Sequence, residues 1–314
     1  MIHSFIFLVL ERNHFSRMFM REQPKRETGS SRGGRIGVQR SDTGCSISCT
    51  ERARYGEPSG SKGMDVRSCL SRIGYGRSLE PNIETLRALQ LSFLLMVPFE
   101  NLDIHLGKEI VLSSETIFEK IVTMRRGGVC YERDILFYDL LTALGFRVEI
   151  LSARMVKGSS IGPEYDHMVL IVSLDEPYLL DVGNGHFLRE PLNINSSENS
   201  YAEGYFYRVG PHDNTYGLFY RQANREWLPR FYFTSQPRLL SEFESMNIFH
   251  QSSPDSLFTR HRIVTIATEE GRKSLSDKRL IIGTGSEKQW KELDSELEYQ
   301  LCLRQYFGIE IPGV

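Results

Sequence analysis

The chain has 314 residues, of which 25% are charged and 40% are hydrophobic, a composition typical of soluble globular proteins with one large core or a few small ones. Its five cysteines are too few and too scattered for a disulfide framework, and their odd number leaves at least one unpaired. The net charge of −2 divides into +5 over residues 1–63 and −7 over the remainder, which argues against a dedicated nucleic-acid binder.

Residues 11–63 are rich in Ser, Gly and Arg and have the periodicity of neither a strand nor a helix. Such a segment cannot bury enough apolar surface to offset its ordering entropy, so a disordered N-terminal extension is expected over residues 1–63. The stretch MDVRSCLSRIGY from Met64 is typical of a protein start. No apolar run reaches the length of a membrane span, and FIFLVL lacks the flanks of a signal peptide, so a cytoplasmic protein is expected.

Helical patterns follow in the next segment. The stretch PNIETLRALQLSFLLM (81–96) repeats apolar residues at helical spacing, and Pro98 prevents its continuation. A second helix is expected at SSETIFEKIV (113–122), which begins on a serine cap. The third, CYERDILFYDLLTALG (130–145), ends on a glycine of the kind that terminates helices. Cys130 therefore lies at or just before a helix N-terminus.

After residue 145 the periodicity becomes that of β-strands. The stretches at 147–156, 167–174 and 177–183 are β-branched and aromatic runs between turn residues, and shorter strands are expected over 193–233. A polar helix, a hairpin around EEGRK (269–273) and an amphipathic C-terminal helix complete the pattern; that last helix is expected to carry Trp290, Leu293, Leu297 and Leu301. Helices segregated before strands indicate an α+β fold. Because no apolar helix face is left over, a monomer is expected.

Cys130 lies in RRGGVCYERD, behind two arginines and two glycines. The thiolate is the nucleophilic form of cysteine, and a helix N-terminus together with Arg125 and Arg126 would favour it. The glycines allow close backbone approach, and the amide of Cys130 could bind an oxyanion. Taken alone, the stretch favours a cysteine packed in a helix-capping turn, because RGG is not specific and also occurs at residues 32–34.

A hairpin supplies two possible partners for this thiol. If the strands of HMVLIVSLDEPYLLD pair symmetrically about Leu174, His167 lies directly opposite Asp181. Opposed side chains on one face are about 5 Å apart at Cβ, so the carboxylate could orient the imidazole. A slip of one residue would place Asp181 on the other face. A cysteine at a helix start, followed by histidine and aspartate on adjacent strands, has the composition of a nucleophile, base and orienting acid. No metal-ligand spacing is visible.

Several motifs now occur in a recognisable order: SRIGYG, ETLRALQ, VPFENLDIHLG, RRGGVCYE, DHMVLIV, YLLDVGNG and FESMNIFHQSSPDSLF. From about Met64 onward the chain resembles the arylamine N-acetyltransferase family. The resemblance implies an α+β fold with a papain- and transglutaminase-like thiol-enzyme core. It implies a helical domain (64–145), a β-barrel-like domain (146–237) and a small α/β lid domain (238–314).

The resemblance also implies the triad Cys130, His167 and Asp181. It implies ping-pong acetyl transfer from acetyl-CoA, through acetyl-cysteine, to an arylamine, hydrazine or N-hydroxyarylamine, without a metal cofactor. By motif position, the acceptor site should be bordered by Phe99, Met155, Asp166 and Asn184, and CoA should lie near Phe249 and Asp255.

Two residues depart from the family pattern. Asn184 stands where the family often has a large aromatic residue, and Asp134 replaces the asparagine of C-x-E/Q-x-N, which we interpret as a helix-surface change. Glu100 and Arg126 are expected to form a buried structural ion pair. Two alternatives stay open: a hydrolytic or transamidating thiol enzyme on the same core, and a non-catalytic ligand-binding relative.

Overall fold

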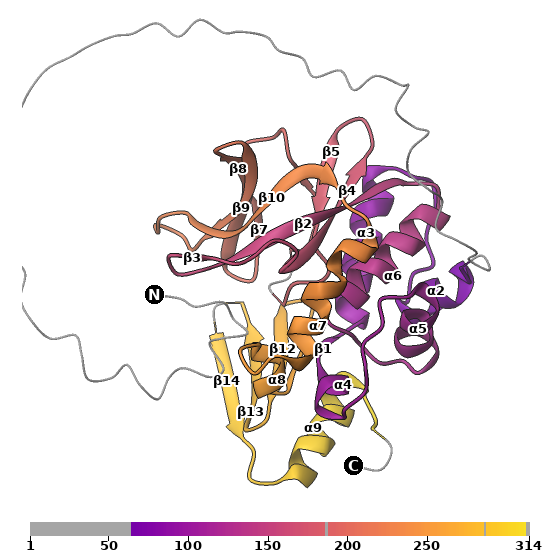
Figure 1. Cartoon of the computed structure of the whole chain (residues 1–314), viewed down its shortest axis with the longest axis vertical. Helices are drawn as coiled ribbons and strands as arrows, with labels where there is room; N and C mark the ends of the chain where they lie inside the picture. Colours follow the sequence, from indigo (N-terminus) through magenta and orange to yellow (C-terminus); the bar gives the residue numbers. More distant parts are fainter. Residues whose placement is uncertain (1–63, 186–187, 286, 312–314) are drawn as a thin grey trace, which may run out of the picture. The chain divides into compact units, whose positions relative to one another are not determined.

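The computed structural model describes residues 64–185, 188–285 and 287–311 (Figure 1). The expected disorder of residues 1–63 falls outside the described residues. Met64, interpreted as a protein start, is the first residue that the structure describes. The three cysteines within the described ranges, Cys69, Cys130 and Cys302, are free and buried. Of the helices described, none is both long enough and apolar enough to cross a membrane.

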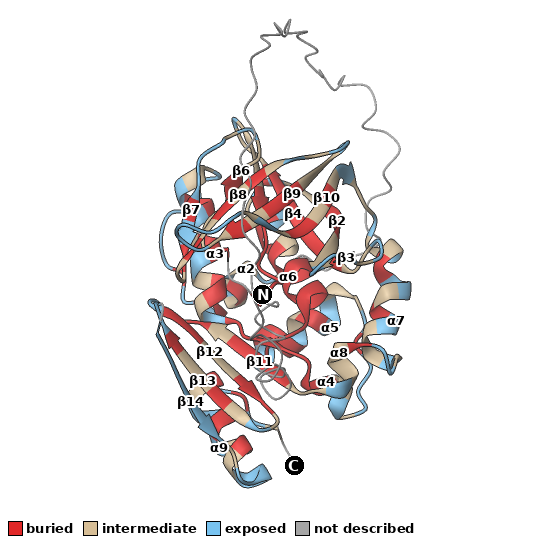
Figure 2. Cartoon of the chain, turned by 90° about the vertical axis from the view of Figure 1, so that its left-hand side faces the viewer, coloured by how far each residue is buried: buried red, intermediate tan, exposed pale blue. Residues whose placement is uncertain are grey.

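The first part of the described chain is helical. Its elements in order are α2 (Val66–Arg72), α3 (Ile83–Met96), β1 (Phe99–Glu100), α4 (Leu102–His105), α5 (Ser114–Phe118), the π-helical turn η1 (Glu119–Thr123) and α6 (Cys130–Ala143). The predicted serine cap is confirmed, because the Ser113 side chain accepts a backbone N–H bond from the first turn of α5. Helix α3 begins two residues later than predicted, after Asn82, whose side chain caps it in the same way. Helix α6 is buried along most of its length (Figure 2).

The middle part forms a nine-stranded antiparallel sheet that curls into a nearly closed barrel. Its strands are β2 (Arg147–Lys157), β3 (Ser160–Ile161), β4 (His167–Ser173), β5 (Pro177–Leu180), β6 (Leu192–Asn193), β7 (Ser200–Ala202), β8 (Tyr205–His212), β9 (Thr215–Arg221) and β10 (Leu228–Pro237). They run in the order β6-β5-β4-β2-β10-β9-β8-β7, with β3 paired to β2. Strand β6 also contacts β8, which brings the two ends of the sheet together.

Strand β4 is buried on both faces, and this explains its continuous hydrophobic run. Val169 and Ile171 belong to the core inside the barrel. Met168, Leu170 and Val172 point the other way, into the core shared with the helices. Helix α6 packs against β2 and β4 from this outer side, so the helix start carrying Cys130 is fixed against the strand that begins with His167.

The last part adds a second antiparallel sheet with the order β1-β11-β12-β13-β14. Its elements are the 3-10 turn η2 (Leu240–Phe243), α7 (Glu244–Ser252), α8 (Leu257–Arg260), β11 (Ile263–Ala267), β12 (Gly271–Ser276), β13 (Arg279–Thr284), β14 (Glu287–Glu292) and α9 (Glu296–Phe307). Because β1 pairs with β11 and also forms a bridge with Gly128, the segment before Cys130 is connected to this sheet.

The C-terminal helix differs from its prediction. Trp290 lies in β14 opposite Ile281, and α9 begins only after the cap residue Ser295. The leucines expected to face inward, Leu297 and Leu301, are 67% and 57% exposed. The buried face instead carries Tyr299, Cys302, Leu303 and Phe307. The leucine spacing continued across a strand and a turn, which a helical period alone does not reveal. The reason given for expecting a monomer does not hold, because Leu297 and Leu301 are exposed on α9.

Candidate active site

The β4–β5 hairpin brings His167 and Asp181 into direct contact. His167 Nε2 lies 3.1 Å from Asp181 Oδ1, and both side chains are buried. The predicted register is wrong by two residues, because Leu170 pairs with Leu180 and the hairpin is centred on residue 175. A register shift of two residues keeps both side chains on the same face of the hairpin. His167 and Asp181 are therefore diagonal neighbours and not directly opposed, and the expected contact still forms.

Asp181 follows the last residue of β5 and is held by the turn after it. Its Oδ1 atom also accepts a hydrogen bond from the backbone N–H of Asn184 at 2.9 Å. The neighbouring Gly183 is required here, because a Cβ atom at that position would lie 2.0 Å from Asp134 Oδ2 and 3.0 Å from the Cα of Cys130. The turn after β5 therefore packs directly on the first turn of α6.

Cys130 is the first residue of α6 and only 5% exposed. Glu132 caps the helix start, since its Oε2 atom accepts the backbone N–H of Val129 at 2.9 Å. Gly128 forms a parallel bridge with Phe99, and a Cβ on Gly127 would lie 2.1 Å from the carbonyl oxygen of Pro98. The two glycines thus allow the close backbone approach expected from the sequence, because they let the chain before Cys130 pack against β1.

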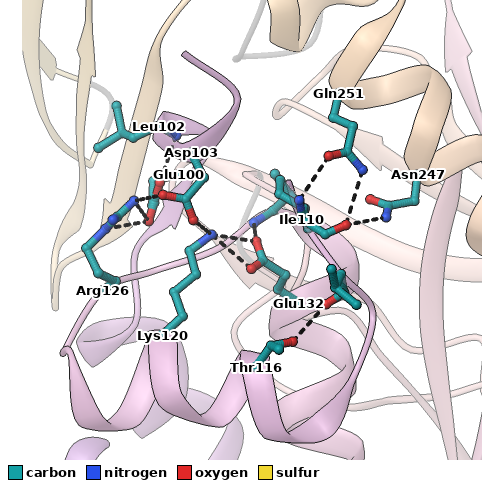
Figure 3. Close-up of polar contacts among 12 residues, drawn as sticks. Glu100, Leu102, Asp103, Ile110, Thr116, Lys120, Arg126, Glu132, Asn247 and Gln251 are labelled. Carbon is teal, nitrogen blue, oxygen red and sulfur yellow. Dashed lines mark hydrogen bonds and ion pairs between the residues drawn. The ribbon is translucent and has the colours of Figure 1, made fainter. Parts of the chain in front are cut away.

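The arginines before Cys130 do not serve the thiol as expected. Arg125 is exposed, and Arg126 forms buried ion pairs with Glu100 at 2.8 Å and Asp103 at 3.0 Å (Figure 3). The predicted Glu100–Arg126 pair is confirmed. Because its guanidinium is already neutralised by two carboxylates, Arg126 is a structural residue and not a stabiliser of the thiolate.

Lys120 links this ion pair to the helix that carries Cys130. Its Nζ atom lies 2.8 Å from Asp103 Oδ2 and 2.9 Å from both carboxylate oxygens of Glu132 (Figure 3). Despite burial, the surrounding carboxylates raise the pKa of Lys120, so it stays charged. The cluster of Glu100, Asp103, Lys120, Arg126 and Glu132 therefore holds the turn before Cys130 against α6.

Replacing Lys120 by methionine should destabilise the protein strongly. The carboxylates of Asp103 and Glu132 would stay buried without their shared cation, which costs about 3–5 kcal/mol. Chemical denaturation should show this loss in the free energy of unfolding. The matched change of exposed Lys108 to methionine should alter it by less than about 0.5 kcal/mol. Equal effects of the two changes would show that the cluster does not stabilise the fold.

A cleft opens at Cys130 and encloses about 710 Å³ of space, part of it open to solvent. Cys130 and His167 both line it. So do all the residues expected at the two substrate sites, namely Phe99, Met155, Asp166, Asn184, Phe249 and Asp255. Segments from the helical part, the barrel and the α7–α8 region thus meet at one cavity.

Known proteins are similar to this chain over most of its length. A family model described as N-acetyltransferase matches residues 82–313. The arylamine N-acetyltransferase of Mycolicibacterium smegmatis is 32% identical over 256 residues, covering 79% of this chain and 93% of that protein. The chain belongs to the arylamine N-acetyltransferase family. Arylamine N-acetyltransferase 2 of Mesocricetus auratus is 31% identical over 278 residues, covering 79% of this chain and 95% of that protein.

Solved arylamine N-acetyltransferase structures have the same fold. The Mycobacterium marinum enzyme in complex with CoA superposes with a TM-score of 0.73 at 28% identity, covering 78% of this chain and 93% of that one. The predicted α+β fold class and the acyltransferase class of enzyme are confirmed. The domain boundaries after residues 145 and 237 stay predictions.

Asp134 differs most from its expected place. In this N-acetyltransferase it is fully buried, not on a helix surface, and its Oδ1 atom accepts the backbone N–H of Val182 at 3.3 Å. Burial raises the pKa of Asp134 well above its ordinary value, and the charge of Asp181 raises it further. The aspartate in place of the family's asparagine was the signal in the sequence that this position is unusual. Helical periodicity separates buried from exposed faces only when one face is exposed, and this part of α6 is buried on all sides.

Burial also raises the pKa of the Cys130 thiol, and a charge on Asp134 would raise it further. The position at a helix N-terminus does not outweigh this desolvation. Nucleophilic thiolate therefore requires a nearby group that accepts the proton. His167 lines the same cleft as Cys130, and its Nε2 atom lies within hydrogen-bond distance of the Asp181 carboxylate.

Two cleft residues were missed by sequence reasoning. His250 on α7 lies 3.5 Å from Asp166 Oδ1. Arg230 on β10 donates a hydrogen bond to Asn184 Oδ1 at 2.6 Å. Asn184 thus occupies its place in the cleft as the polar partner of a buried arginine. Both contacts join residues more than forty positions apart, which local patterns do not predict.

Proposed function

We propose that the enzyme transfers an acetyl group from acetyl-CoA to the nitrogen of arylamines, hydrazines or N-hydroxyarylamines, through an acetyl thioester on Cys130. The contact between His167 Nε2 and Asp181, in the cleft that also exposes Cys130, is the observation that carries this proposal. With Nε2 engaged by the carboxylate, Nδ1 is the ring nitrogen left to exchange a proton with the thiol.

In the first half-reaction, His167 Nδ1 accepts the thiol proton, and the Cys130 sulfur attacks the thioester carbonyl carbon of acetyl-CoA. The backbone N–H of Cys130, at the start of α6, is available to the developing oxyanion. The carbon–sulfur bond to CoA then breaks, and the CoA thiolate takes the proton from the imidazolium. Acetyl-Cys130, free CoA and neutral His167 remain.

In the second half-reaction, the neutral amine attacks the carbonyl carbon of acetyl-Cys130. His167 takes one proton from the nitrogen as the new carbon–nitrogen bond forms, and the bond to the Cys130 sulfur breaks. The proton returns to the sulfur, which restores the thiol. Burial of Cys130 to 5% exposure limits the access of water, which would otherwise hydrolyse the thioester.

The cleft lining suggests where the two substrates bind. We propose Phe99 and Met155 as the apolar wall for the aromatic ring of the acceptor, with Asp166 and Asn184 at its polar border. CoA is proposed to lie near Phe249 and Asp255. An acid facing a polyphosphate is unfavourable, but Lys157 lines the same cleft and supplies a positive charge.

The experiment that tests this proposal separates the two half-reactions. Mixed with acetyl-CoA alone, the protein should acquire one acetyl group on Cys130, detected by intact-protein and peptide mass spectrometry. Subsequent addition of an aromatic amine should remove that group and yield the N-acetyl product. Acylation by peptide esters but not by acetyl-CoA would instead indicate a hydrolytic or transamidating thiol enzyme. Absence of any acyl-enzyme would indicate a ligand-binding protein.

A further inference from the structure

Two carboxyl groups are buried together beside the candidate triad. One oxygen of Asp134, one oxygen of Asp181 and a ring nitrogen of His167 all lie within 4.8 Å of one another. Asp134 and Asp181 are each 0% exposed. Two carboxylates that share one dry site cannot both carry a charge without a large electrostatic cost.

The hydrogen bonds at this site use one carboxyl oxygen of each aspartate, Oδ1, and do not use the other. Asp181 Oδ1 accepts from His167 and from the backbone of Asn184, and Asp134 Oδ1 accepts from the backbone of Val182. The remaining atoms, Asp134 Oδ2 and Asp181 Oδ2, are buried and make no hydrogen bond of good geometry, although the backbone N–H of Gly183 also faces the Asp134 carboxyl group. Because an oxygen of one acid lies within 4.8 Å of an oxygen of the other, a proton on one carboxyl group would let it donate a hydrogen bond to its neighbour.

The charges around the two acids indicate which one is neutral. On α6, Asp134 is flanked by Arg133, whose positive charge favours the carboxylate, and by the Cys130 thiol. His167 from β4 and Asp181 from the turn after β5 face it from the barrel side. Asp181 itself lies near Arg230 of β10 and is bonded to His167, so the surviving negative charge is best placed there.

We propose that Asp134 is a carboxylic acid in the working enzyme and that its Oδ2 hydroxyl donates a hydrogen bond to Asp181. This inference rests on the proposed function of the triad. Asp134 is then a positioning residue that fixes the carboxylate which orients His167. Where the family pattern has an asparagine amide, this chain can present a donor only while its acid keeps the proton. A neutral Asp134 also avoids opposing the negative charge that forms on the sulfur of Cys130.

The alternative to a proton between these groups is a metal cation bound by Asp134, His167 and Asp181. A cation bound through His167 Nε2 would have to displace the contact of that nitrogen with Asp181 Oδ1 at 3.1 Å. A chelator distinguishes the two possibilities, because it removes a bound metal cation but not a proton. Loss of activity after dialysis against a chelator, with recovery on adding a divalent cation, would overturn the proposal.

Replacing Asp134 by asparagine and by alanine tests whether its side chain donates a hydrogen bond to Asp181. Asp134→Asn should keep kcat/KM for acetyl-enzyme formation near the wild-type value at neutral pH, since an amide replaces the hydroxyl. Asp134→Ala should lower it about 10- to 100-fold, because Asp181 loses a buried charge-assisted hydrogen bond. At alkaline pH, where Asp134 ionises, the wild type should lose activity relative to Asp134→Asn. Equal damage by both changes in folded protein would overturn the proposal.

Infrared difference spectroscopy tests the protonation state without catalysis. In a Cys130→Ala background at neutral pH, the C=O stretch of a protonated carboxyl group should be present and should vanish on Asp134→Asn. The exposed Asp175→Asn change is the matched control and should leave the band in place. Absence of the band overturns the inference about Asp134 even if acetyl transfer is observed. A band without acetyl transfer would contradict the proposed function alone.

Discussion

Replacing Cys130 by alanine or serine is expected to abolish acetyl transfer, with kcat/KM lower by at least about 10⁴-fold. Alanine removes the atom that would carry the acetyl group, and a serine hydroxyl is a far weaker nucleophile without a lowered pKa. Both side chains fit the space of the thiol, so the fold should be retained. Turnover of an aromatic amine by acetyl-CoA measures the loss, and intact mass should show no acetyl-enzyme.

The matched control for loss of a buried thiol is Cys302→Ala in α9, which lies outside the residues that line the cleft. This variant should keep both turnover and acetyl-enzyme formation. Near-normal turnover in folded Cys130→Ala would show that the acetyl group passes through another residue or directly between the substrates.

Replacing His167 by glutamine is expected to lower kcat/KM by about 10²- to 10⁴-fold. Glutamine can still donate to Asp181, but it cannot accept the thiol proton. Because burial raises the pKa of Cys130, its reaction with iodoacetamide should then require a markedly more alkaline pH than in the wild type. The rate of alkylation at Cys130 as a function of pH measures this shift directly, independent of either substrate.

Two other histidines sharpen this test. His105 is exposed on α4, and its change to glutamine should leave the alkylation profile unmoved. His250 lines the same cleft beside Asp166, and burial lowers its pKa, so it is neutral at physiological pH. A profile that shifts on His250→Gln and not on His167→Gln would assign the base to α7 instead of β4.

Much of the fold was predictable from local rules. The serine cap at residue 113 and the continuous apolar run of β4 are properties of short segments, because capping and periodicity depend on near neighbours in the chain. Leucine spacing failed at the C-terminus for the same reason. It continued across Ser295, and the choice of buried face depended on the sheet that α9 meets.

The sequence by itself determined which groups could act: a cysteine at a helix start, and a histidine and an aspartate on one face of a hairpin. An even error in register left that face unchanged, so the prediction survived it. Only the tertiary structure decided what surrounds them. Arg126 pairs with Glu100, and Asp134 meets Val182 across 48 positions of sequence. Charge and protonation depend on burial and on partners distant in the chain, and no local pattern contains that information.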